Sequence, residues 1–257
     1  MGKVIALMNE KGGVGKSALT FSCAWNMVEK GKRVLVVDMD GQKANITYLA
    51  GVKTDVGTKT IEDVLLRDVP IQDCIQSVPC GQQDCTLDIV PATVQMAALP
   101  TTAKMSKMKK VMREIKQQYD MVFLDVNPSP DWRHALTLSV LDGVGVVMLP
   151  DVLSLEANRG VFDSIEEITE GANANLKVLG IILNQFDIRT RLAKAVIDKA
   201  GEMAQFYGAL LFATKVRKAV ALSESAAAHI GVTAYAPASA VANDIRALTD
   251  ELLEMMK

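Results

Sequence analysis

The amino-acid sequence predicts an α/β fold built on a mostly parallel, twisted sheet with helices on both faces. The first observation is a series of strand-length apolar runs that are β-branched and nearly continuous, which is typical of strands buried on both faces. The second is that helix-like segments lie between most of these runs, which indicates right-handed βαβ crossovers. The third is the length of 257 residues with 49% apolar residues, enough for one large domain or two small ones. Because no internal repeat or long linker divides the chain, we expect a single domain over residues 1–257.

The candidate strands are apolar runs bounded by polar or turn-forming residues. They are residues 4–8 (VIALM), 34–37 (VLVV), 87–90 (LDIV), 121–126 (MVFLDV), 144–149 (VGVVML) and 178–183 (VLGIIL). In open α/β sheets, ligands bind beyond the carboxyl ends of the strands. The residues that follow each run are therefore the first candidates for a functional site.

The candidate helices carry apolar residues at three-to-four spacing. They are residues 17–30, 103–118, 154–170, 191–206 and 239–256. Gly31 follows the first helix where a C-cap is expected, and Ser154 begins the third at an N-cap position.

Composition and charge exclude several classes of protein. No apolar run approaches the roughly 18 residues of a membrane span, and the first residues enter a strand pattern without a signal-peptide layout, so we expect a cytoplasmic protein. The net charge of −2 excludes a polycation, so any nucleic-acid binding requires a local basic patch. Cys74, Cys80 and Cys85 lack the CxxC pairs of a zinc site, which favours reduced structural thiols over a metal or redox role.

Residues 9–18 (NEKGGVGKSA) follow the first strand and nearly match the phosphate-binding pattern GxxxxGK[ST]. Glu10 stands where that pattern has its first glycine, and Lys11 adds a second lysine to the loop. The glycines let backbone N–H groups point inward, and the following helix adds its positive dipole end, which together form an anion cradle. Lys16 would then neutralise phosphate, and the Ser17 hydroxyl could ligate Mg²⁺.

Acidic residues follow two other strands. Asp38 and Asp40 end the second run, and Asp125 ends the MVFLDV run before a proline-rich turn. A carboxylate at a strand end facing a phosphate loop can hold Mg²⁺ or water. The alternative is that these acids cap turns, but their position beside the glycine loop favours the first interpretation.

Basic residues are concentrated in two segments. Residues 187–218 contain seven basic and three acidic side chains, and residues 104–116 contain six basic residues and Glu114. Charge runs usually form solvated faces, which is the interpretation favoured for residues 104–116. Few aromatic residues lie nearby, so any nucleic-acid contact would be to duplex phosphates rather than to stacked single-strand bases.

The segments KGGVGKS, VVDMDGQ and FLDVNPS resemble the deviant Walker A, switch I and Walker B segments of the ParA/MinD family of P-loop ATPases. LNQFDIRTRL at 183–192 and the region KVRKAVALSES at 215–225 resemble later segments of short, Soj-like ParA proteins, and the similarity runs from residue 2 to about residue 254. The chain departs from the family at Gly41, where DPQ is usual, and at Val126 and Asn127, within the usual DTPPS. Because glycine is more flexible than proline, Gly41 predicts a looser switch I.

This resemblance implies a single ParA-type ATPase domain with the P-loop NTPase fold and no separate N-terminal DNA-binding domain. It implies Mg²⁺-dependent hydrolysis of ATP, with ATP and Mg²⁺ as cofactors and Lys11, Lys16 and Asp40 as catalytic residues. Lys11 would cross a dimer interface to the partner's ATP, as an arginine finger does, and Asp40 would position water; the alternative for Lys11 is a solvated loop lysine. The implied nucleotide-binding residues are Lys11, Gly12, Gly13, Val14, Gly15, Lys16, Ser17, Ala18 and Asn184, the last as a reader of adenine or else an ordinary turn residue. The implied metal ligands are Ser17, Asp38 and Asp125, and the implied DNA-binding residues are Arg189, Arg191, Lys215, Arg217 and Lys218.

The function that the resemblance implies is DNA partition. An ATP-dependent homodimer would bind double-stranded DNA nonspecifically, and a ParB-like centromere-binding protein would stimulate hydrolysis, so the protein would be nucleoid-associated and would not bind membrane. The alternative is a MinD-like, membrane-associated positioning ATPase. That alternative needs a basic amphipathic C-terminal helix, whereas residues 243–257 are acidic.

Overall fold

The computed structural model describes the chain except for residues 42–44, 82–84, 99–104, 130, 152–157 and 191–192. Its described strands form an eight-stranded sheet in the order β3-β4-β2-β5-β1-β6-β7-β8. All neighbouring strands are parallel except β3 and β4, which are antiparallel. The strands are β1 (Lys3–Met8), β2 (Val34–Asp38), β3 (Gln76–Pro79), β4 (Thr86–Val90), β5 (Met121–Asp125), β6 (Gly143–Met148), β7 (Lys177–Phe186) and β8 (Val216–Arg217). The predicted α/β class and mostly parallel sheet are confirmed.

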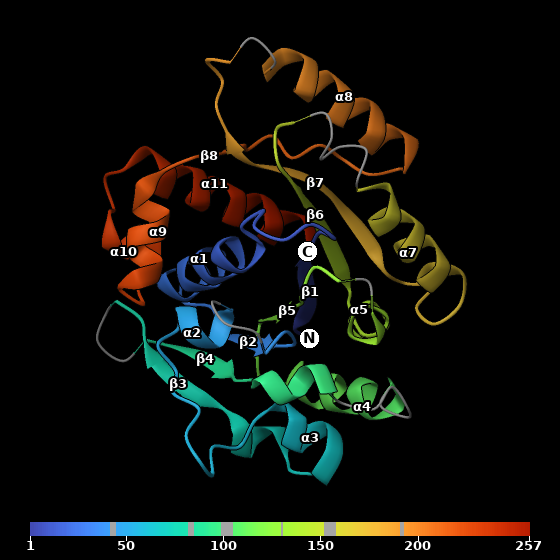
Figure 1. The fold of residues 1–257 in the computed structure, drawn as a ribbon, viewed down its shortest axis with the longest axis vertical. Coiled ribbons are helices and arrows are strands. Elements are labelled where there is room, and N and C mark those ends of the chain that lie inside the picture. Colours follow the sequence, from blue (N-terminus) through green and yellow to red (C-terminus); the bar gives the residue numbers. More distant parts are fainter. Residues whose placement is uncertain (42–44, 82–84, 99–104, 130, 152–157, 191–192) are drawn as a thin grey trace.

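Helices cover both faces of the sheet (Figure 1). One face packs against α1 (Lys16–Glu29), α2 (Ile46–Leu49), α10 (Val232–Tyr235) and α11 (Ala240–Met255), with α9 (Val220–Ala227) beside them. The other packs against α3 (Ile61–Arg67), α4 (Met105–Ile115), α5 (Trp132–Leu138), α7 (Arg159–Glu170) and α8 (Ala193–Phe206). Two short 3-10 helices, η1 (Ile71–Cys74) and η2 (Val94–Ala98), complete the described elements.

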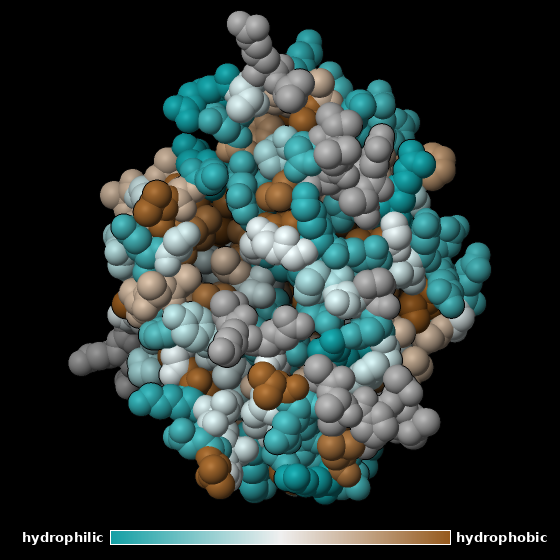
Figure 2. Space-filling view, viewed as in Figure 1, coloured by the Kyte–Doolittle hydropathy of each residue, from teal (hydrophilic) through white to brown (hydrophobic). Residues whose placement is uncertain are grey.

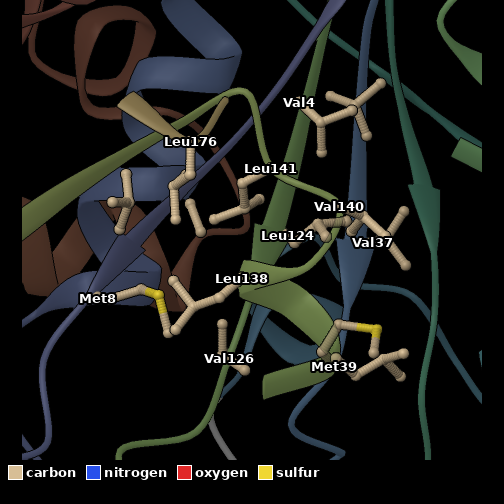
Figure 3. Packing of buried hydrophobic residues seen from close by; sticks show 14 of the residues in the cluster. Val4, Met8, Val37, Met39, Leu124, Val126, Leu138, Val140, Leu141 and Leu176 are labelled. Atoms are coloured by element: carbon tan, nitrogen blue, oxygen red, sulfur yellow. The ribbon is translucent and has the colours of Figure 1, made fainter. Parts of the chain in front are cut away.

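The buried strands have continuous apolar runs because both of their faces need apolar side chains. In β1, Val4, Ala6 and Met8 belong to one core cluster, whereas Ile5 and Leu7 belong to the other. This alternation follows from the two-residue period of a strand. Figure 3 shows Val4 and Met8 with residues of β2 and β5 in the first cluster.

Three of the predicted element ends can be compared with the structure. Gly31 has a φ of 77° and follows α1, where its N–H donates to the Val28 carbonyl and the Lys32 N–H donates to the Met27 carbonyl. These two bonds form a Schellman motif, so the predicted glycine C-cap is confirmed. The prediction that the strand ends at Leu183 is wrong, because β7 continues to Phe186 and contains Asn184. The Ser154 N-cap lies outside the described residues.

The strand β3 was not predicted from the sequence. It is short, half-exposed and contains Pro79, and it pairs antiparallel at the edge of the sheet. An edge strand tolerates proline because one side of its backbone needs no partner strand.

The surface is largely hydrophilic in the view of Figure 2, with apolar and small side chains gathered over α9 and α10 at the left. Within the described residues, no helix combines the length and apolar character that crossing a membrane requires.

Candidate functional site

The phosphate loop joins β1 to α1 near the centre of Figure 1. Gly13 and Gly15 adopt positive φ angles of 77° and 88°, whereas Gly12 does not. Gly15 is the N-cap of α1, and a Cβ atom there would lie 2.5 Å from Nδ2 of Asn184. A side chain at Gly15 would therefore be strained and also collide with β7, which explains the glycine at this position.

Two asparagines, Asn9 at the start of the loop segment and Asn184 on β7, hold this loop in place. Asn9 is fully buried, and its Nδ2 donates to the Val147 carbonyl at 2.5 Å and to Oδ1 of Asn158 at 2.6 Å. Its Oδ1 accepts from the backbone N–H of Lys11. Asn9 was missed by the sequence analysis, because a single asparagine after a strand carries no pattern that distinguishes it from a turn residue.

Asn184 contacts the loop from β7. Its Nδ2 donates to the Val14 carbonyl at 2.7 Å, and the neighbouring Gln185, which has a φ of 56°, donates from Nε2 to the Gly13 carbonyl at 3.4 Å. Because a carbonyl only accepts, this bond fixes which end of the Asn184 amide is nitrogen. The Oδ1 atom of Asn184 is buried and has no hydrogen-bond partner among the described residues. Asn184 therefore positions the loop, and its contact with adenine stays a prediction.

Glu10 turns away from the phosphate loop toward α7. Its carboxylate packs over Gly160, where a Cβ atom would lie 2.6 Å from Oε2 of Glu10. Burial, with the negative charge of Asp163 nearby, raises the pKa of Glu10. Lys11, the next residue, is exposed. The glutamate therefore belongs to the packing behind the loop, while Lys11 lies at the surface.

The three predicted carboxylates meet at the carboxyl edge of the sheet. Asp38 and Asp125 end the neighbouring strands β2 and β5 and are partners in the strand register. Lys16 is 7% exposed, and burial lowers its pKa while the charges of Asp125 and Asp40 oppose that shift. Burial also raises the pKa of Asp40 to about 6. In Asp125, burial and then the charge of Asp38 raise the pKa, and the Ser17 hydroxyl and Lys16 act in the opposite direction. The neighbouring positions of β2 and β5 in the sheet thus bring Asp38 and Asp40 close to Asp125, which is more than 80 positions later in the sequence.

Asp38 and Asp125 differ in their hydrogen bonding. Oδ1 of Asp38 accepts from the N–H groups of Asp40 (2.9 Å) and Gly41 (3.1 Å), and Oδ2 accepts from the N–H (3.2 Å) and hydroxyl (2.5 Å) of Thr47. All four acceptor positions of this carboxylate are therefore in use. Both oxygens of Asp125 and Oδ1 of Asp40 are buried and receive no hydrogen bond of normal geometry in the described part of the chain, although the Ser17 hydroxyl lies close enough to Asp125 to lower its pKa. Such oxygens suit a hard cation such as Mg²⁺, so Asp125 fits a metal ligand better than Asp38, whose ligand role stays a prediction.

Gly41 is buried and has a φ of 68°. A Cβ atom there would lie 2.0 Å from the Thr93 carbonyl oxygen. Proline, which is fixed near a φ of about −65°, cannot adopt this conformation. Close packing therefore requires glycine at Gly41 itself, and the expectation of a looser switch I stays a prediction, because residues 42–44 lie outside the described part of the chain.

Arg133 is a site residue that the sequence analysis missed. It lies in the first turn of α5 and is 5% exposed. Its Nη1 donates to the carbonyl oxygen of Asp40 at 3.2 Å. Its guanidinium is held by Asp131, the N-cap of α5, with contacts of 2.5 to 3.1 Å. Asn127 also donates to Asp131, at 3.4 Å. Asn127, one of the two residues that differ from the family's usual segment, therefore links the end of β5 to Asp131. Asp131 in turn orients Arg133 toward the Asp40 carbonyl.

Among the described residues of the predicted DNA-binding set, Arg189 follows β7, Lys215 precedes β8, Arg217 ends β8 and Lys218 follows it. In the register of these strands Arg217 is the partner of Phe186, a few residues before Arg189. Arg189 makes a two-pronged ion pair with Asp187 at 2.8 and 2.9 Å, and Arg217 makes one with Asp244 at 2.6 and 2.8 Å. Asp187 and Asp244 therefore accept from the guanidinium N–H groups that would otherwise donate to DNA phosphates.

Lys215 and Lys218 flank Arg217. Lys215 is half-buried and donates to the Ala213 carbonyl at 2.9 Å, and Lys218 is exposed. Arg191 lies outside the described residues.

Around α4, Lys110 and Arg113 are exposed, whereas three other lysines contact the protein. Lys107 pairs with Asp68, Lys116 pairs with Asp142 at 2.7 Å, and Lys109 donates to a backbone carbonyl at 2.8 Å. The opposite side of α4 is buried in the core. This arrangement agrees with the prediction of a solvated helix face.

A strand, a glycine loop with a buried lysine, and carboxylates at adjacent strand ends of a parallel sheet define a P-loop ATPase. The profile of the family described as an AAA domain matches residues 2–178. The chain is 32% identical to the chromosome-partitioning ATPase Soj of Thermus thermophilus over 250 residues, which is 97% of this chain and 94% of that protein. It is also 30% identical to the cell division protein PomZ of Myxococcus xanthus, over 96% of this chain and 76% of that protein. The chain therefore belongs to the ParA/MinD family of P-loop ATPases and is Soj-like.

Solved structures share the fold. The cobyrinic acid a,c-diamide synthase of Mycobacterium smegmatis with bound ATP analog and magnesium has a TM-score of 0.84 at 23% identity, over 100% of this chain and 96% of that chain. The cell division ATPase MinD of Pyrococcus furiosus has a TM-score of 0.79 at 21% identity, over 99% of this chain and 100% of that chain.

Proposed function

We propose that this chain is a ParA-type partition ATPase that binds ATP with Mg²⁺, closes into a dimer and hydrolyses ATP to ADP and phosphate. The observation that carries this proposal is the set of buried oxygens of Asp125 and Asp40 beside Lys16 that receive no hydrogen bond of normal geometry from the described residues. Buried acceptors without donors destabilise the folded state. A cation with its water ligands would supply those partners. The similarity to the chromosome-partitioning ATPase Soj supports the choice of ATP.

The residues of one subunit would each act on a different part of the nucleotide. The glycine loop would donate backbone N–H groups to the phosphates, and Lys16 would neutralise their charge. Ser17 and Asp125 would hold Mg²⁺, which when bound neutralises charge on phosphate oxygens. The Oδ1 of Asn184, which no described residue donates to, is an acceptor that an adenine amino group could satisfy.

Asp40 would orient the attacking water. Its main-chain carbonyl is held by Arg133, and its Oδ1 has no donor among the described residues, so a water molecule could bond to it. We expect Lys16→Ala to abolish ATP binding, and Asp40→Ala to bind ATP but hydrolyse it slowly. Hydrolysis by Asp40→Ala at the wild-type rate would contradict the role of Asp40.

Lys11 would act on the ATP of the second subunit. It is exposed at the loop while Lys16 is buried, so one lysine serves its own pocket and the other can reach a neighbour. A cation that arrives only when two subunits close would stabilise charge on the transferring phosphoryl group.

A mixture of two inactive variants tests this role. Lys11→Ala subunits bind ATP without donating Lys11, and Lys16→Ala subunits donate Lys11 without binding ATP. A mixed dimer holds one complete composite site, so ATPase activity should rise above that of both parents. If Lys11→Ala alone loses monomer ATP affinity as severely as Lys16→Ala, Lys11 belongs to its own pocket and the trans role is wrong.

The dimer would bind duplex DNA through Arg189, Arg191, Lys215, Arg217 and Lys218, and a ParB-like partner would trigger hydrolysis and release. One ATPase domain would thus both hydrolyse ATP and bind DNA. The protein would be cytoplasmic and nucleoid-associated. Exposed Lys218 and the nearby Arg189 and Arg217 support this surface. If one subunit makes about three phosphate contacts, raising salt from about 50 to about 200 mM should weaken binding about 40-fold, against about a thousandfold for a six-contact dimer. The steeper dependence should require ATP; equal slopes with ADP and ATP would contradict a dimer-assembled site.

A MinD-like membrane role has less support. The apolar side chains of α11, including Val241, Ile245, Leu248 and Leu252, are buried against the core. A membrane-binding helix needs such a face exposed. Co-sedimentation with anionic vesicles, compared with a duplex-DNA gel shift in ATP, separates the two functions.

A further inference from the structure

Two cysteines lie opposite each other on the β3–β4 hairpin. These strands pair antiparallel with Pro79 opposite Thr86, so the next pair is Cys80 and Cys85. The backbone N–H of Cys80 donates to the Cys85 carbonyl at 2.8 Å, which continues the ladder to this pair. From the sequence, Cys80 and Cys85 were expected to be reduced structural thiols without a redox role.

The two side chains share one face of the hairpin. Cys80 belongs to the core cluster around α1, and Cys85 packs against the same cluster, as do Val78 and Leu87 two positions further along each strand. In a hydrogen-bonded antiparallel pair such as this one, the Cα atoms lie about 5.5 Å apart and the Cβ atoms lie near the upper end of about 4.5 to 5.5 Å. A disulfide requires Cα atoms about 4.4 to 6.8 Å apart and Cβ atoms about 3.5 to 4.5 Å apart. The Cα separation therefore suits a disulfide, and the Cβ atoms must approach each other by about 1 Å.

The two thiols differ in exposure. Cys85 is half-buried, whereas Cys80 is 1% exposed and its Sγ donates to the Trp25 carbonyl of α1 at 3.7 Å. Burial raises the pKa of Cys80 to about 12, which makes it the slower nucleophile of the two. Cys85 is thus the sulfur that a small solute can reach, and Cys80 is positioned to react with it second.

We propose that Cys80 and Cys85 are a reversible oxidation site at which a peroxide converts the dithiol into a disulfide. The Cys85 thiolate attacks hydrogen peroxide, so an S–O bond forms, the O–O bond breaks and hydroxide leaves, taking up a proton to become water. The Cys80 sulfur then attacks the sulfenic sulfur of Cys85; the S–S bond forms, the S–O bond breaks, and the Cys80 proton leaves with the hydroxyl group as a second water. Two thiols are oxidised and one peroxide is reduced to two waters.

The disulfide changes the hairpin at a defined place. It ties the ends of β3 and β4 together and removes the Cys80 thiol from the Trp25 carbonyl on α1, the helix that follows the phosphate loop. A bond that needs adjustment of a hydrogen-bonded strand pair is more easily reduced than a relaxed structural disulfide. The site is therefore reversible by thiols.

Peptide mapping of the full-length protein tests the proposal. The protein is treated with hydrogen peroxide, alkylated under denaturing conditions and cleaved before aspartate, which yields residues 73–83 with Cys80 and residues 84–87 with Cys85. We expect these two peptides joined, with the mass of two hydrogens lost, and separated again after dithiothreitol. Recovery of both peptides fully alkylated, or of Cys85 carrying sulfinic acid without a joined peptide, would overturn the proposal.

Three single variants identify which cysteines form the disulfide. Cys74 lies in the same peptide as Cys80, so Cys74→Ser is the matched control and should still give the joined peptide. Cys80→Ser should abolish it and leave Cys85 as sulfenic acid, trapped by dimedone. Cys85→Ser should leave Cys80 alkylatable. Loss of the joined peptide in Cys74→Ser with retention in Cys80→Ser would show that Cys74 is the partner and overturn the assignment.

Discussion

Replacing Gly15 by alanine tests how the phosphate loop is held. At a φ of 88° an alanine is strained by about 1 to 2 kcal/mol, of which about 0.4 to 1 kcal/mol is offset by the lower entropy of the unfolded chain. The new Cβ would also lie 2.5 Å from Nδ2 of Asn184 and displace it from the buried Val14 carbonyl. An unsatisfied buried carbonyl costs about 1 to 3 kcal/mol, so the total loss of unfolding free energy should be about 3 kcal/mol.

Gly13→Ala is the matched control. Gly13 has a similar φ of 77°, but a Cβ atom there meets nothing within 4 Å. The unfolding free energy of Gly13→Ala should therefore fall by only about 1 kcal/mol, because of backbone strain alone. The measurement is urea unfolding of both variants without nucleotide, followed by circular dichroism. Equal losses for the two variants would refute the argument that contact with Asn184 makes glycine necessary at Gly15.

Three further predictions concern residues around the site and the basic surface. Burial lowers the pKa of His134 from 6.5 to about 4, so the unfolded chain binds more protons in this interval and stability should fall as pH drops through it; His134→Gln should flatten this part of a urea-midpoint profile, and an unchanged profile would contradict it. Asp38→Asn should lower the unfolding free energy by about 3 kcal/mol, because an amide cannot accept all four hydrogen bonds that Asp38 receives; a loss below about 1 kcal/mol would be inconsistent with that network. Asp244→Asn should tighten duplex-DNA binding about two- to fivefold by releasing the exposed Arg217 guanidinium, and weaker binding in a gel shift would show that the ion pair positions Arg217 instead of masking it.

The main elements could be predicted because their signals are local. The apolar runs predicted the central strands, since a strand buried on both faces needs apolar residues at every position, as β1 shows. The edge strand β3 was missed, because a short run with Pro79 becomes a strand only when β4 supplies a partner. Arg133 and Asn9 were missed for a related reason: a single polar residue becomes informative only when its partners are known.

The sequence by itself determined the glycine loop, its two lysines and the acids at the strand ends, because the order of residues along one strand and turn specifies them. Only the tertiary structure shows that Asp38 accepts four hydrogen bonds, whereas Asp125 accepts none of normal geometry from the described residues, since these contacts depend on the turn that follows β2. It also decided that Arg217 meets Asp244, and that Cys80 lies opposite Cys85. Strand order and register bring such pairs together, and neither is encoded in the spacing of the residues involved.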